Sequence, residues 1–471
     1  MERDINPEDS IQRLLNPRHI AIIGASDTPG RIGHIIYKTL LSSSAVLYPV
    51  NTKQERVGTH RALNSPSELP GNLDLAIVTI NAAAAVEAAE ACALKGCANI
   101  VIIAGGFAET GDEGKALETR LRVLPEKYGC RILGPNSLGV FVPSSNLDTI
   151  FVEHGDQALS EGGGVAFITQ SGSVGVESLG LASNSGFGMR AFVGIGNKVD
   201  LSEADFLPWF GNDPDTDCIA LYVESIERGR SFLEDARDVA RSKPVVLLKA
   251  GRTQAGASAV SSHTGRLAGS DKVVSGALRQ YGVQRAMDDE ELCDASKVLS
   301  MVRPAQGNRV AVITPAGGFG VMCSDYIDSP DRRASLCMAE ISEITQKRIK
   351  EKTFPYASCH NPVDLTAGAT DEMFLETLKA LMDDEGVDII ICVAFFAPPT
   401  ISENLLPAMS ALIREAPKPV LVFTQYGPFT DEYLRRFYRE GVAGYPSINR
   451  VIRAARFLVE RQRVLKDLED K

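Results

Sequence analysis

An internal repeat is the feature of this sequence that most restricts its fold. Segment 164–175 (GVAFITQSGSVG) aligns with 309–320 (RVAVITPAGGFG), and six of the twelve positions are identical at a constant offset of 145 residues. Two further pairs of segments follow in the same order, namely 217–224 with 388–395 and 243–251 with 418–427. Three matched segments in one order predict two copies of a single α/β unit, spanning roughly 155–300 and 305–471.

Short β-branched runs alternate with Ala-, Leu- and Glu-rich stretches along the whole chain. This alternation is typical of α/β proteins, in which helices connect the strands of parallel sheets. In the first third we expect strands at 19–24, 45–50, 73–80, 99–104 and 131–134, and helices at 31–43, 82–95 and 114–127. At about 150 residues per domain, 471 residues also suggest three domains. We therefore predict domains at 1–150, 151–303 and 304–471, with a polar linker at 303–308.

Each copy of the repeat opens with a strand, a glycine-rich turn and a helix. Backbone N–H groups at a helix N-terminus form an anion site when no side chains obstruct them. Two such turns in paired domains predict that one phosphate is held from both sides. The residues expected to hold it are Thr169, Ser171, Gly172 and Ser173 in the first copy and Thr314, Gly317 and Gly318 in the second. A purely structural role is the alternative, because tight packing of a helix on a strand also requires glycine.

A third glycine-rich turn, 24–33, follows the first expected strand and opens a helix, as a nucleotide-binding turn does. It is a poor NAD fingerprint, because Ala25 and Ser26 replace the middle of the G-x-G-x-x-G pattern. The second strand ends at Asn51, where a dinucleotide site needs Asp or Glu for the ribose. Lys53 favours a phosphorylated ribose instead, so coenzyme A with its 3′-phosphate fits better than NAD. A bare structural turn is the alternative.

A polar segment, 251–271, separates an expected strand from the next helix. Between 251 and 266 only Val260 is a sizeable apolar residue, so we expect an exposed and mobile loop. The second copy has no counterpart, because Gly427 leads directly into a helix start. His263 is the sole histidine of this insertion, and imidazole can form a covalent intermediate as a nucleophile. A surface histidine without function is the alternative.

Composition disfavours several classes of partner. The net charge of −11 argues against a nucleic acid and against anionic lipid. The longest apolar run, 389–399, is shorter than the ~18 residues of a membrane helix. The acidic N-terminus lacks the apolar core of a signal peptide, so we expect a soluble cytoplasmic protein. The nine cysteines show neither CxxC pairs nor zinc spacing, which favours buried thiols, a reducing compartment and no metal site.

Segment 262–271 (SHTGRLAGSD), together with 134–139 (GPNSLG) and 361–364 (NPVD), resembles the α subunit of the NDP-forming acyl-CoA synthetases. The ADP-forming acetyl-CoA synthetases are the most similar branch, and succinyl-CoA synthetase is a more distant relative. The resemblance covers essentially the whole chain. It implies a Rossmann-like CoA-binding domain followed by two flavodoxin-like domains with doubly wound parallel sheets.

In that family, acyl-CoA and phosphate yield acyl phosphate and free CoA, and a histidine then passes the phosphoryl group to ADP. The resemblance implies that His263 is this histidine and that Glu224 hydrogen-bonds its ring. An ion pair of Glu224 with Arg228 or Arg230 is the alternative. Positions where relatives contact CoA correspond to Gly24, Ala25, Ser26, Arg31, Asn51, Lys53, Thr79, Gly105 and Asn136.

The glycine-rich lid and carboxylate pattern of an ATP-grasp domain is missing from this sequence. The resemblance therefore implies a separate ATP-grasp β subunit that binds ADP or ATP with Mg²⁺, in the α2β2 arrangement usual for the family. A small carboxylic acid or its acyl-CoA is the expected substrate. An NAD-dependent oxidoreductase is disfavoured because the acidic ribose residue is missing. A non-catalytic CoA- or acyl-CoA-binding regulatory protein of the same fold is the main alternative.

Overall fold

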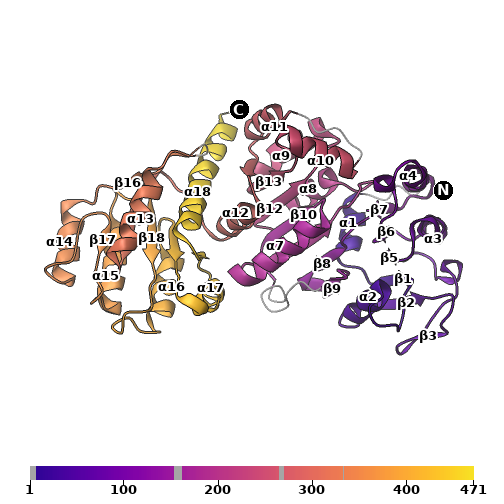
Figure 1. The fold of residues 1–471 in the computed structure, drawn as a ribbon, viewed down its shortest axis with the longest axis horizontal. Coiled ribbons are helices and arrows are strands. Elements are labelled where there is room, and N and C mark those ends of the chain that lie inside the picture. The colour runs from indigo at the N-terminus through magenta and orange to yellow at the C-terminus, as the bar shows by residue number, and fades with distance from the viewer. Residues whose placement is uncertain (1–6, 153–161, 265–269, 332–333, 471) are drawn as a thin grey trace. The chain divides into compact units, whose positions relative to one another are not determined.

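A computed structural model of the chain describes residues 7–152, 162–264, 270–331 and 334–470 (Figure 1). The chain divides into two compact units, Met1–Gly180 with Gly188–Asp289 and Leu181–Phe187 with Glu290–Lys471. Besides a two-stranded hairpin, the described residues of the first unit form two sheets and those of the second unit form one. The main strands of all three sheets have the same order, 2-1-3-4-5 when numbered along the chain, which is the doubly wound order predicted from the resemblance.

The first sheet is parallel and consists of apolar strands buried on both faces, as parallel sheets require. Its strands, in spatial order, are β2 (Val46–Val50), β1 (His19–Ile23), β5 (Leu75–Val78), β6 (Asn99–Ile102) and β7 (Arg131–Leu133). All five expected strands are confirmed. A separate hairpin is formed by β3 (Arg56–Val57) and β4 (His60–Arg61).

Helices cover both faces of this sheet. One face packs on α1 (Pro7–Leu15) and α2 (Ile32–Leu40). The other packs on α3 (Ala82–Leu94), α4 (Asp112–Arg122) and α5 (Leu124–Tyr128), and the short turns are η1 (Pro66–Glu68) and η2 (Ala108–Thr110). The single helix expected over 114–127 is wrong in one respect, because it is broken at Val123. Pro125, which has no N–H group to donate, lies in the first turn of α5.

The second sheet follows the same plan and gains two strands from the preceding segment. Its order is β14 (Gln284–Ala286), β13 (Val245–Lys249), β12 (Cys218–Val223), β10 (Val165–Thr169), β11 (Met189–Gly194), β8 (Val140–Val142) and β9 (Leu147–Asp148). The turn η3 (Pro143–Ser145) connects β8 to β9. Strand β8 pairs antiparallel with β11, and β9 pairs antiparallel with β8. The domain boundary at residue 150 stays a prediction, but in strand pairing 140–148 belong to the second sheet.

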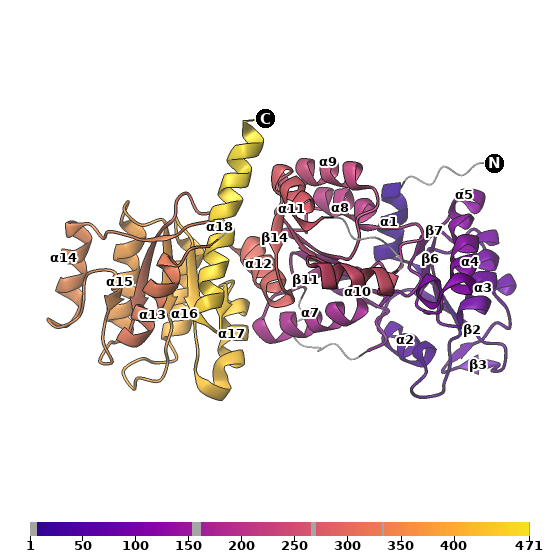
Figure 2. The same cartoon turned by 45° about the horizontal axis from the view of Figure 1, so that its top comes forward.

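Helices also line both faces of the second sheet. In Figure 2, α8 (Glu203–Asn212) and α9 (Gly229–Ala240) lie on one side of it, and α7 (Gly172–Ser185) lies on the other. Two helices, α10 (Gln254–Thr264) and α11 (Asp271–Gln280), connect β13 to β14.

The third sheet repeats the parallel part of the second. Its order is β16 (Cys337–Met338), β15 (Arg309–Thr314), β18 (Ile389–Val393), β19 (Val420–Phe423) and β20 (Gly444–Tyr445), and β17 (Val363–Asp364) also pairs with β15. The strand registers agree as well, because Ile219 is paired with Val245 in one copy and Ile390 with Val420 in the other. The internal repeat is therefore confirmed.

The second unit has its own helices. These are α12 (Asp289–Met301), α13 (Gly317–Asp328), α14 (Glu343–Lys352), α15 (Asp371–Asp383), α16 (Leu405–Glu415), α17 (Thr430–Arg439), which follows the turn η4 (Gly427–Phe429), and α18 (Ile448–Glu469). The division between the units differs from the expected linker at 303–308, because the second unit already contains α12 from Glu290 onward. Arg450 of α18 makes a bidentate pair with the buried Asp294 of α12 and so ties α12 to this unit.

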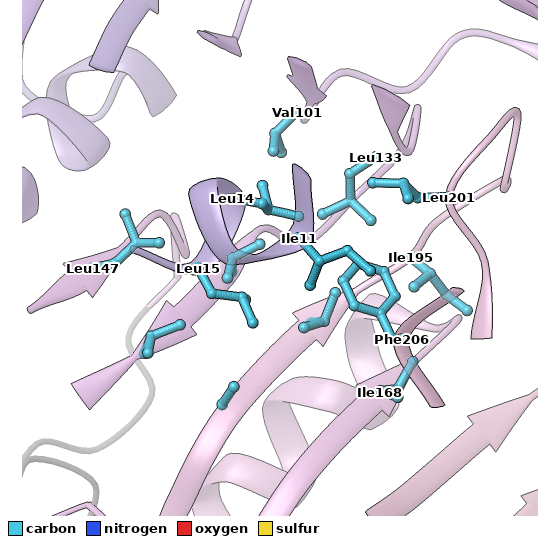
Figure 3. Packing of buried hydrophobic residues seen from close by; sticks show 14 of the residues in the cluster. Ile11, Leu14, Leu15, Val101, Leu133, Leu147, Ile168, Ile195, Leu201 and Phe206 are labelled. Atoms are coloured by element: carbon cyan, nitrogen blue, oxygen red, sulfur yellow. The ribbon is translucent and has the colours of Figure 1, made fainter. Parts of the chain in front are cut away.

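One hydrophobic core runs through both sheets of the first unit. Figure 3 shows Ile11 and Leu14 of α1 among Leu133 of the first sheet and Ile168 and Phe206 of the second sheet and its helix α8. Because α1 contributes to both sheets, the two sheets cannot separate without exposing these side chains to water.

Backbone hydrogen bonds reinforce this joint. The N–H groups of Asn197, Val199 and Leu201 donate to the carbonyls of Pro135, Gly134 and Ile132, respectively, over 2.9–3.1 Å. Ion pairs lie alongside, since the guanidinium group of Arg131 contacts both carboxylate oxygens of Asp200. We refer to these contacts between 131–137 and 195–205 as the domain joint.

The cysteines pack as predicted, with seven of nine buried and the other two half-buried. Burial raises the pKa of the Cys92 thiol to about 12, which keeps it protonated at neutral pH. None of the helices in the described ranges is both long and apolar enough to cross a membrane.

Candidate functional site

A large cavity lies at the carboxyl edge of the first sheet. The strand order reverses between β1 and β5, and ligands of open α/β sheets bind at such a switch point. The cavity there has a volume of about 1240 Å³, enough for a cofactor-sized molecule. Of the nine residues expected to contact CoA, six line it, namely Gly24, Ser26, Arg31, Asn51, Lys53 and Thr79. We call it the first cavity.

Two glycines allow the turn at the base of the first cavity to form. Gly24 has φ +94°, a left-handed conformation that favours glycine. A Cβ atom on Gly33 would lie 2.0 Å from the carbonyl oxygen of Gly24. The hydroxyl of Thr79 donates to the carbonyl of Ile23 over 2.9 Å and fixes the end of β1 against β5. The backbone can therefore approach a ligand closely where α2 begins.

The groups around this turn suit an anionic ligand. Arg31 is the residue before α2, and no side chain accepts the first N–H groups of this helix at that position. Lys53 is exposed at the cavity, and its backbone N–H donates to Asn51 Oδ1 over 2.7 Å. A helix N-terminus with two cations fits the pyrophosphate and 3′-phosphate of CoA.

Asn51 also has a structural role, and its contact with CoA stays a prediction. Its Nδ2 donates to the carbonyl of Ala25 over 2.7 Å, and its Oδ1 accepts the N–H groups of Lys53 and Gln54. The side chain therefore ties the end of β2 to the glycine-rich turn and orients the loop that carries Lys53.

The other three expected CoA contacts lie outside the first cavity. Ala25 is completely buried. Gly105 and Asn136 follow β6 and β7, and a Cβ on Gly105 would lie 3.3 Å from Asn136 Oδ1. Glu109 of η2 lies beside these two residues. Its carboxylate accepts hydrogen bonds from the N–H of Gly106 over 2.7 Å and from Nδ2 of Asn197 over 2.7 Å. Burial alone would raise the pKa of Glu109, but these hydrogen bonds lower it.

The two glycine-rich turns of the repeat have the same internal structure. In the first, Thr169 Oγ1 donates to the carbonyl of Ser171 over 2.8 Å and accepts its N–H. In the second, Thr314 Oγ1 donates to the carbonyl of Ala316 over 2.8 Å and accepts its N–H. Both threonine hydroxyls therefore hold their turns, and the expectation that they also face a phosphate stays a prediction.

The helices that follow the two turns differ in what lies beside them. A Cβ on Gly172 would meet Leu138 at 3.9 Å, whereas a Cβ on Gly317 would lie 2.6 Å from a carboxylate oxygen of Asp364. The N-terminus of α13 thus already has a negative charge beside it, and α7 has an apolar neighbour. Of the two helix ends, that of α7 is electrostatically the better anion site. At α7, Ser171 Oγ lies 3.2 Å from Ser173 Oγ.

Glu224 directly follows β12 and is only 6% exposed. Its N–H, like that of Ser225, donates to the side-chain oxygen of Gln170, a residue of the first glycine-rich turn. Arg228, one of the two alternative partners of Glu224 with Arg230, donates to Asp205 and to Ser202 Oγ. Gln170 was missed from the sequence, although its place between two predicted phosphate ligands was a usable signal.

The segment with His263 is not the structureless loop that we expected. Residues Gln254–Thr264 form α10, and the hydroxyl of Thr253 accepts the N–H of Gly256 over 3.0 Å at its start. The correction follows from helix propensity, because alanine and glutamine favour helix even without an apolar face. His263 lies within this helix, near its C-terminal end. Residues 265–269 lie outside the described residues.

The position of α10 within the first unit is informative. It packs against η2, the turn that carries Glu109 beside Gly105. The helix with His263 therefore lies at the carboxyl edge of the first sheet, the edge that also carries the first cavity. Among the described residues, the second copy has only η4 and α17 between β19 and β20, where the first copy has α10 and α11, so it lacks a counterpart of α10, as predicted.

A second cavity of about 460 Å³ lies at the carboxyl ends of β12 and β13. Its lining includes Tyr222, Lys249 and Arg252. Burial raises the pKa of Tyr222 to about 12, with smaller contributions from Glu224 and Asp289. Burial also lowers the pKa of Lys249. The burial of this lysine was not predicted from the sequence.

Two family models match the chain. A CoA binding domain matches residues 18–143, and a succinyl-CoA ligase like flavodoxin domain matches residues 162–299. The first match contains the first cavity and the second contains α7, Glu224 and α10.

Curated relatives extend the match to the whole chain. The α subunit of acetate–CoA ligase [ADP-forming] II from Pyrococcus furiosus is 35% identical over 455 residues, which cover 95% of this chain and 97% of that subunit. Acetate–CoA ligase [ADP-forming] I from Archaeoglobus fulgidus is also 35% identical, over 98% of this chain and 66% of that protein.

A solved structure agrees with this assignment. The acetyl-coenzyme A synthetase 1 of Candidatus Korarchaeum cryptofilum, determined in complex with phosphate and ADP, superposes with a TM-score of 0.88 at 31% identity. The superposition covers 98% of each chain. The chain therefore belongs to the family of ADP-forming acetate–CoA ligases and matches the α subunit of that family along its length.

Proposed function

We propose that this chain is the α subunit of an ADP-forming acyl-CoA synthetase. It interconverts acyl-CoA, ADP and phosphate with a carboxylic acid, CoA and ATP. The observation that carries the proposal is the position of α10, which brings the helix with His263 to the sheet edge that has the CoA-sized first cavity. A regulatory CoA-binding protein has no need of a histidine helix at that edge.

The reaction begins with acyl-CoA in the first cavity. A phosphate oxygen attacks the thioester carbonyl, the C–S bond breaks, and acyl phosphate and the CoA thiolate form. Gly24, Ser26, Arg31, Lys53 and Thr79 bind CoA in this proposal, with Gly105 and Asn136 toward the acyl end. The thiolate takes up a proton from water.

His263 then receives the phosphoryl group. Its neutral ring nitrogen attacks phosphorus, the bond between phosphorus and the acyl oxygen breaks, and the carboxylic acid leaves as carboxylate. Ser171, Gly172 and Ser173 offer hydroxyl and backbone N–H donors to the phosphoryl oxygens, and Thr169 shapes their turn. The turn of the second copy, with Thr314, Gly317 and Gly318, is not used in this proposal, because the Asp364 carboxylate lies beside Gly317.

Glu224 acts on the imidazole and not on the phosphoryl group. A carboxylate that accepts the N–H of one ring nitrogen leaves the other nitrogen unprotonated and nucleophilic. Gln170 supports this role, because it binds the backbone of Glu224 and belongs to the turn that holds the phosphate. An uncharged side chain in place of Glu224 would form a weaker hydrogen bond with the imidazole N–H of His263.

A partner subunit completes the reaction. We propose an ATP-grasp β subunit that binds ADP with Mg²⁺ and accepts the phosphoryl group from His263, so that the P–N bond breaks as the new P–O bond of ATP forms. The support is that the relatives matched from end to end are named as α subunits. An α2β2 assembly in the cytoplasm is the form proposed for this enzyme.

The test is phosphorylation of the chain, with and without the partner subunit. Acetyl-CoA and radiolabelled phosphate should label His263, and the label should be lost in acid and survive alkali, as a phosphoramidate does. His263→Ala should abolish labelling and ATP formation while CoA binding persists. Glu224→Gln should lower the labelled fraction without removing it.

His360 provides the matched control, because it is an exposed histidine of the other unit. His360→Ala should label like the wild-type chain. An acid-stable label, or normal labelling of His263→Ala, would contradict the phosphohistidine proposal.

A further inference from the structure

Lys249 is a buried cation beside the second cavity, which we call the Lys249 cavity. The residue is only 5% exposed. Its Nζ donates to the carbonyl of Ala250 over 2.5 Å. An ammonium group has three N–H donors, so two remain for other acceptors. The Lys249 cavity gives a ligand access to them.

The Lys249 cavity reaches the starts of two helices. Val174, in the first turn of α7, lines it, and so do Thr253 and Gly256 at the start of α10. Lys249 is thus placed between the turn proposed to hold the phosphate and the helix that carries His263. The charged residues that line the cavity are Lys249, Arg252, Asp288 and Asp289. Of these, only the two cations Lys249 and Arg252 can attract an anion.

The internal repeat shows which lysines this fold needs for structure. Lys243 begins the β13 segment and donates to the carbonyls of Phe210 and Asp213. Its counterpart in the second copy, Lys418, donates to the carbonyls of Asp384 and Val387. Asp213 and Asp384 are themselves equivalent positions. This lysine keeps one structural role in both copies.

Lys249 behaves differently. The register of the paired strands makes Thr424 its counterpart, and Phe395 is the counterpart of Glu224. Both charges are therefore present in the copy with the His263 helix and absent from the copy without it. The sheet itself does not require a lysine at this position.

Keeping a charge here is unfavourable for folding. Burial lowers the pKa of Lys249, and the carboxylates of Asp271 and Glu224 oppose that effect while Arg285 adds to it. A buried ammonium is tolerated when it is paired or when it serves a ligand. The two unused donors and the adjoining cavity favour a ligand.

We propose that Lys249 binds the phosphoryl group at the α7 turn and holds it within reach of the His263 helix. The proposal rests on the function proposed above and assigns a binding role to a residue outside the two glycine-rich turns. The ligand is a phosphoryl oxyanion, supplied as inorganic phosphate or as acyl phosphate. The ammonium group offsets its charge and donates hydrogen bonds to its oxygens.

The experiment measures ATP formation by the assembled α and β subunits from acetyl-CoA, ADP and phosphate. Lys249→Met should raise the KM for phosphate by about 10- to 100-fold, the effect of losing a charge-assisted hydrogen bond. The KM for acetyl-CoA should stay within about twofold, because the first cavity lies elsewhere. Lys249→Arg should restore most of the phosphate affinity.

Lys243→Met is the matched control. It removes a structural lysine from the same strand segment and should lower the melting temperature without changing the KM for phosphate. If Lys249→Met does not fold, Lys249→Gln carries the same expectation. An unchanged KM for phosphate, an equal rise in the KM for acetyl-CoA, or an equal effect of Lys243→Met would overturn the proposal. Absence of ATP formation by the wild-type assembly would instead refute the proposed function.

Discussion

Replacing Asp200 by alanine should weaken the domain joint of the first unit. The carboxylate accepts Arg131 Nε over 2.9 Å, Arg131 Nη2 over 3.0 Å and the N–H of Ile132 over 2.8 Å. Both side chains of the ion pair are largely buried, at 18% and 16% exposure. The substitution leaves a buried guanidinium group and an unpaired backbone N–H.

The magnitude follows from these contacts. Removing one partner of a buried ion pair costs about 3–5 kcal/mol. Arg131 keeps a second carboxylate, since its Nη2 lies 3.0 Å from Asp205 Oδ1, so the lower end applies. We expect the free energy of unfolding of the first unit to fall by about 3 kcal/mol.

The assay uses the only tryptophan of the chain. Trp209 lies in α8 of the first unit, with its ring 5.0 Å from that of Phe210. Its fluorescence during urea denaturation therefore reports the first unit alone. Asp238→Ala removes the exposed partner of Arg237 and should change the transition by about 0.5 kcal/mol or less. An Asp200→Ala shift no larger than that of Asp238→Ala would refute the reasoning.

Three further outcomes are expected. Lys53→Ala should weaken CoA binding by about tenfold and dephospho-CoA binding less, since only CoA has the 3′-phosphate; calorimetry showing equal losses would contradict this. Gly33→Ala should abolish CoA binding, because its Cβ would lie 2.0 Å from the Gly24 oxygen, while Gly276→Ala, which meets no atom within 4 Å, should leave binding unchanged. Burial lowers the pKa of Lys297 to about 7. The unfolded chain therefore binds more protons between pH 7 and 10.5, so the free energy of unfolding should rise with pH across that window, and Lys297→Met should flatten the rise seen in urea titrations.

The repeat made much of the fold predictable from the sequence. Matched runs of apolar residues located β10, β12 and β13 and their counterparts, and the shared registers confirm them. The edge strands β8 and β9 were not predicted. They are three and two residues long, and β8 pairs with a strand about 50 residues later, so local sequence carries no signal for them.

The candidate site was predicted in part, for similar reasons. The turn at Gly24 and the residues Asn51 and Lys53 indicated the first cavity, because strand ends and glycines are visible in the sequence. The helix at His263 was missed, because apolar periodicity is the main sequence signal of a helix and this segment has few apolar residues. The burial of Lys249 was missed, because it depends on the position of β13 between β12 and β14, which come from distant parts of the sequence.

The pairing of β8 and β9 with the second sheet has a consequence for how genes of this kind can be rearranged. A recombination event or expression fragment that cuts at residue 150 leaves Val140–Val142 and Leu147–Asp148 on one piece and their partner β11 on the other. The shared core around α1 would be divided as well. The CoA-binding and histidine-bearing halves of the first unit must therefore be inherited together. The second unit has its own core, but it also includes Leu181–Phe187, so a cut near residue 290 would separate this segment from the rest of that unit.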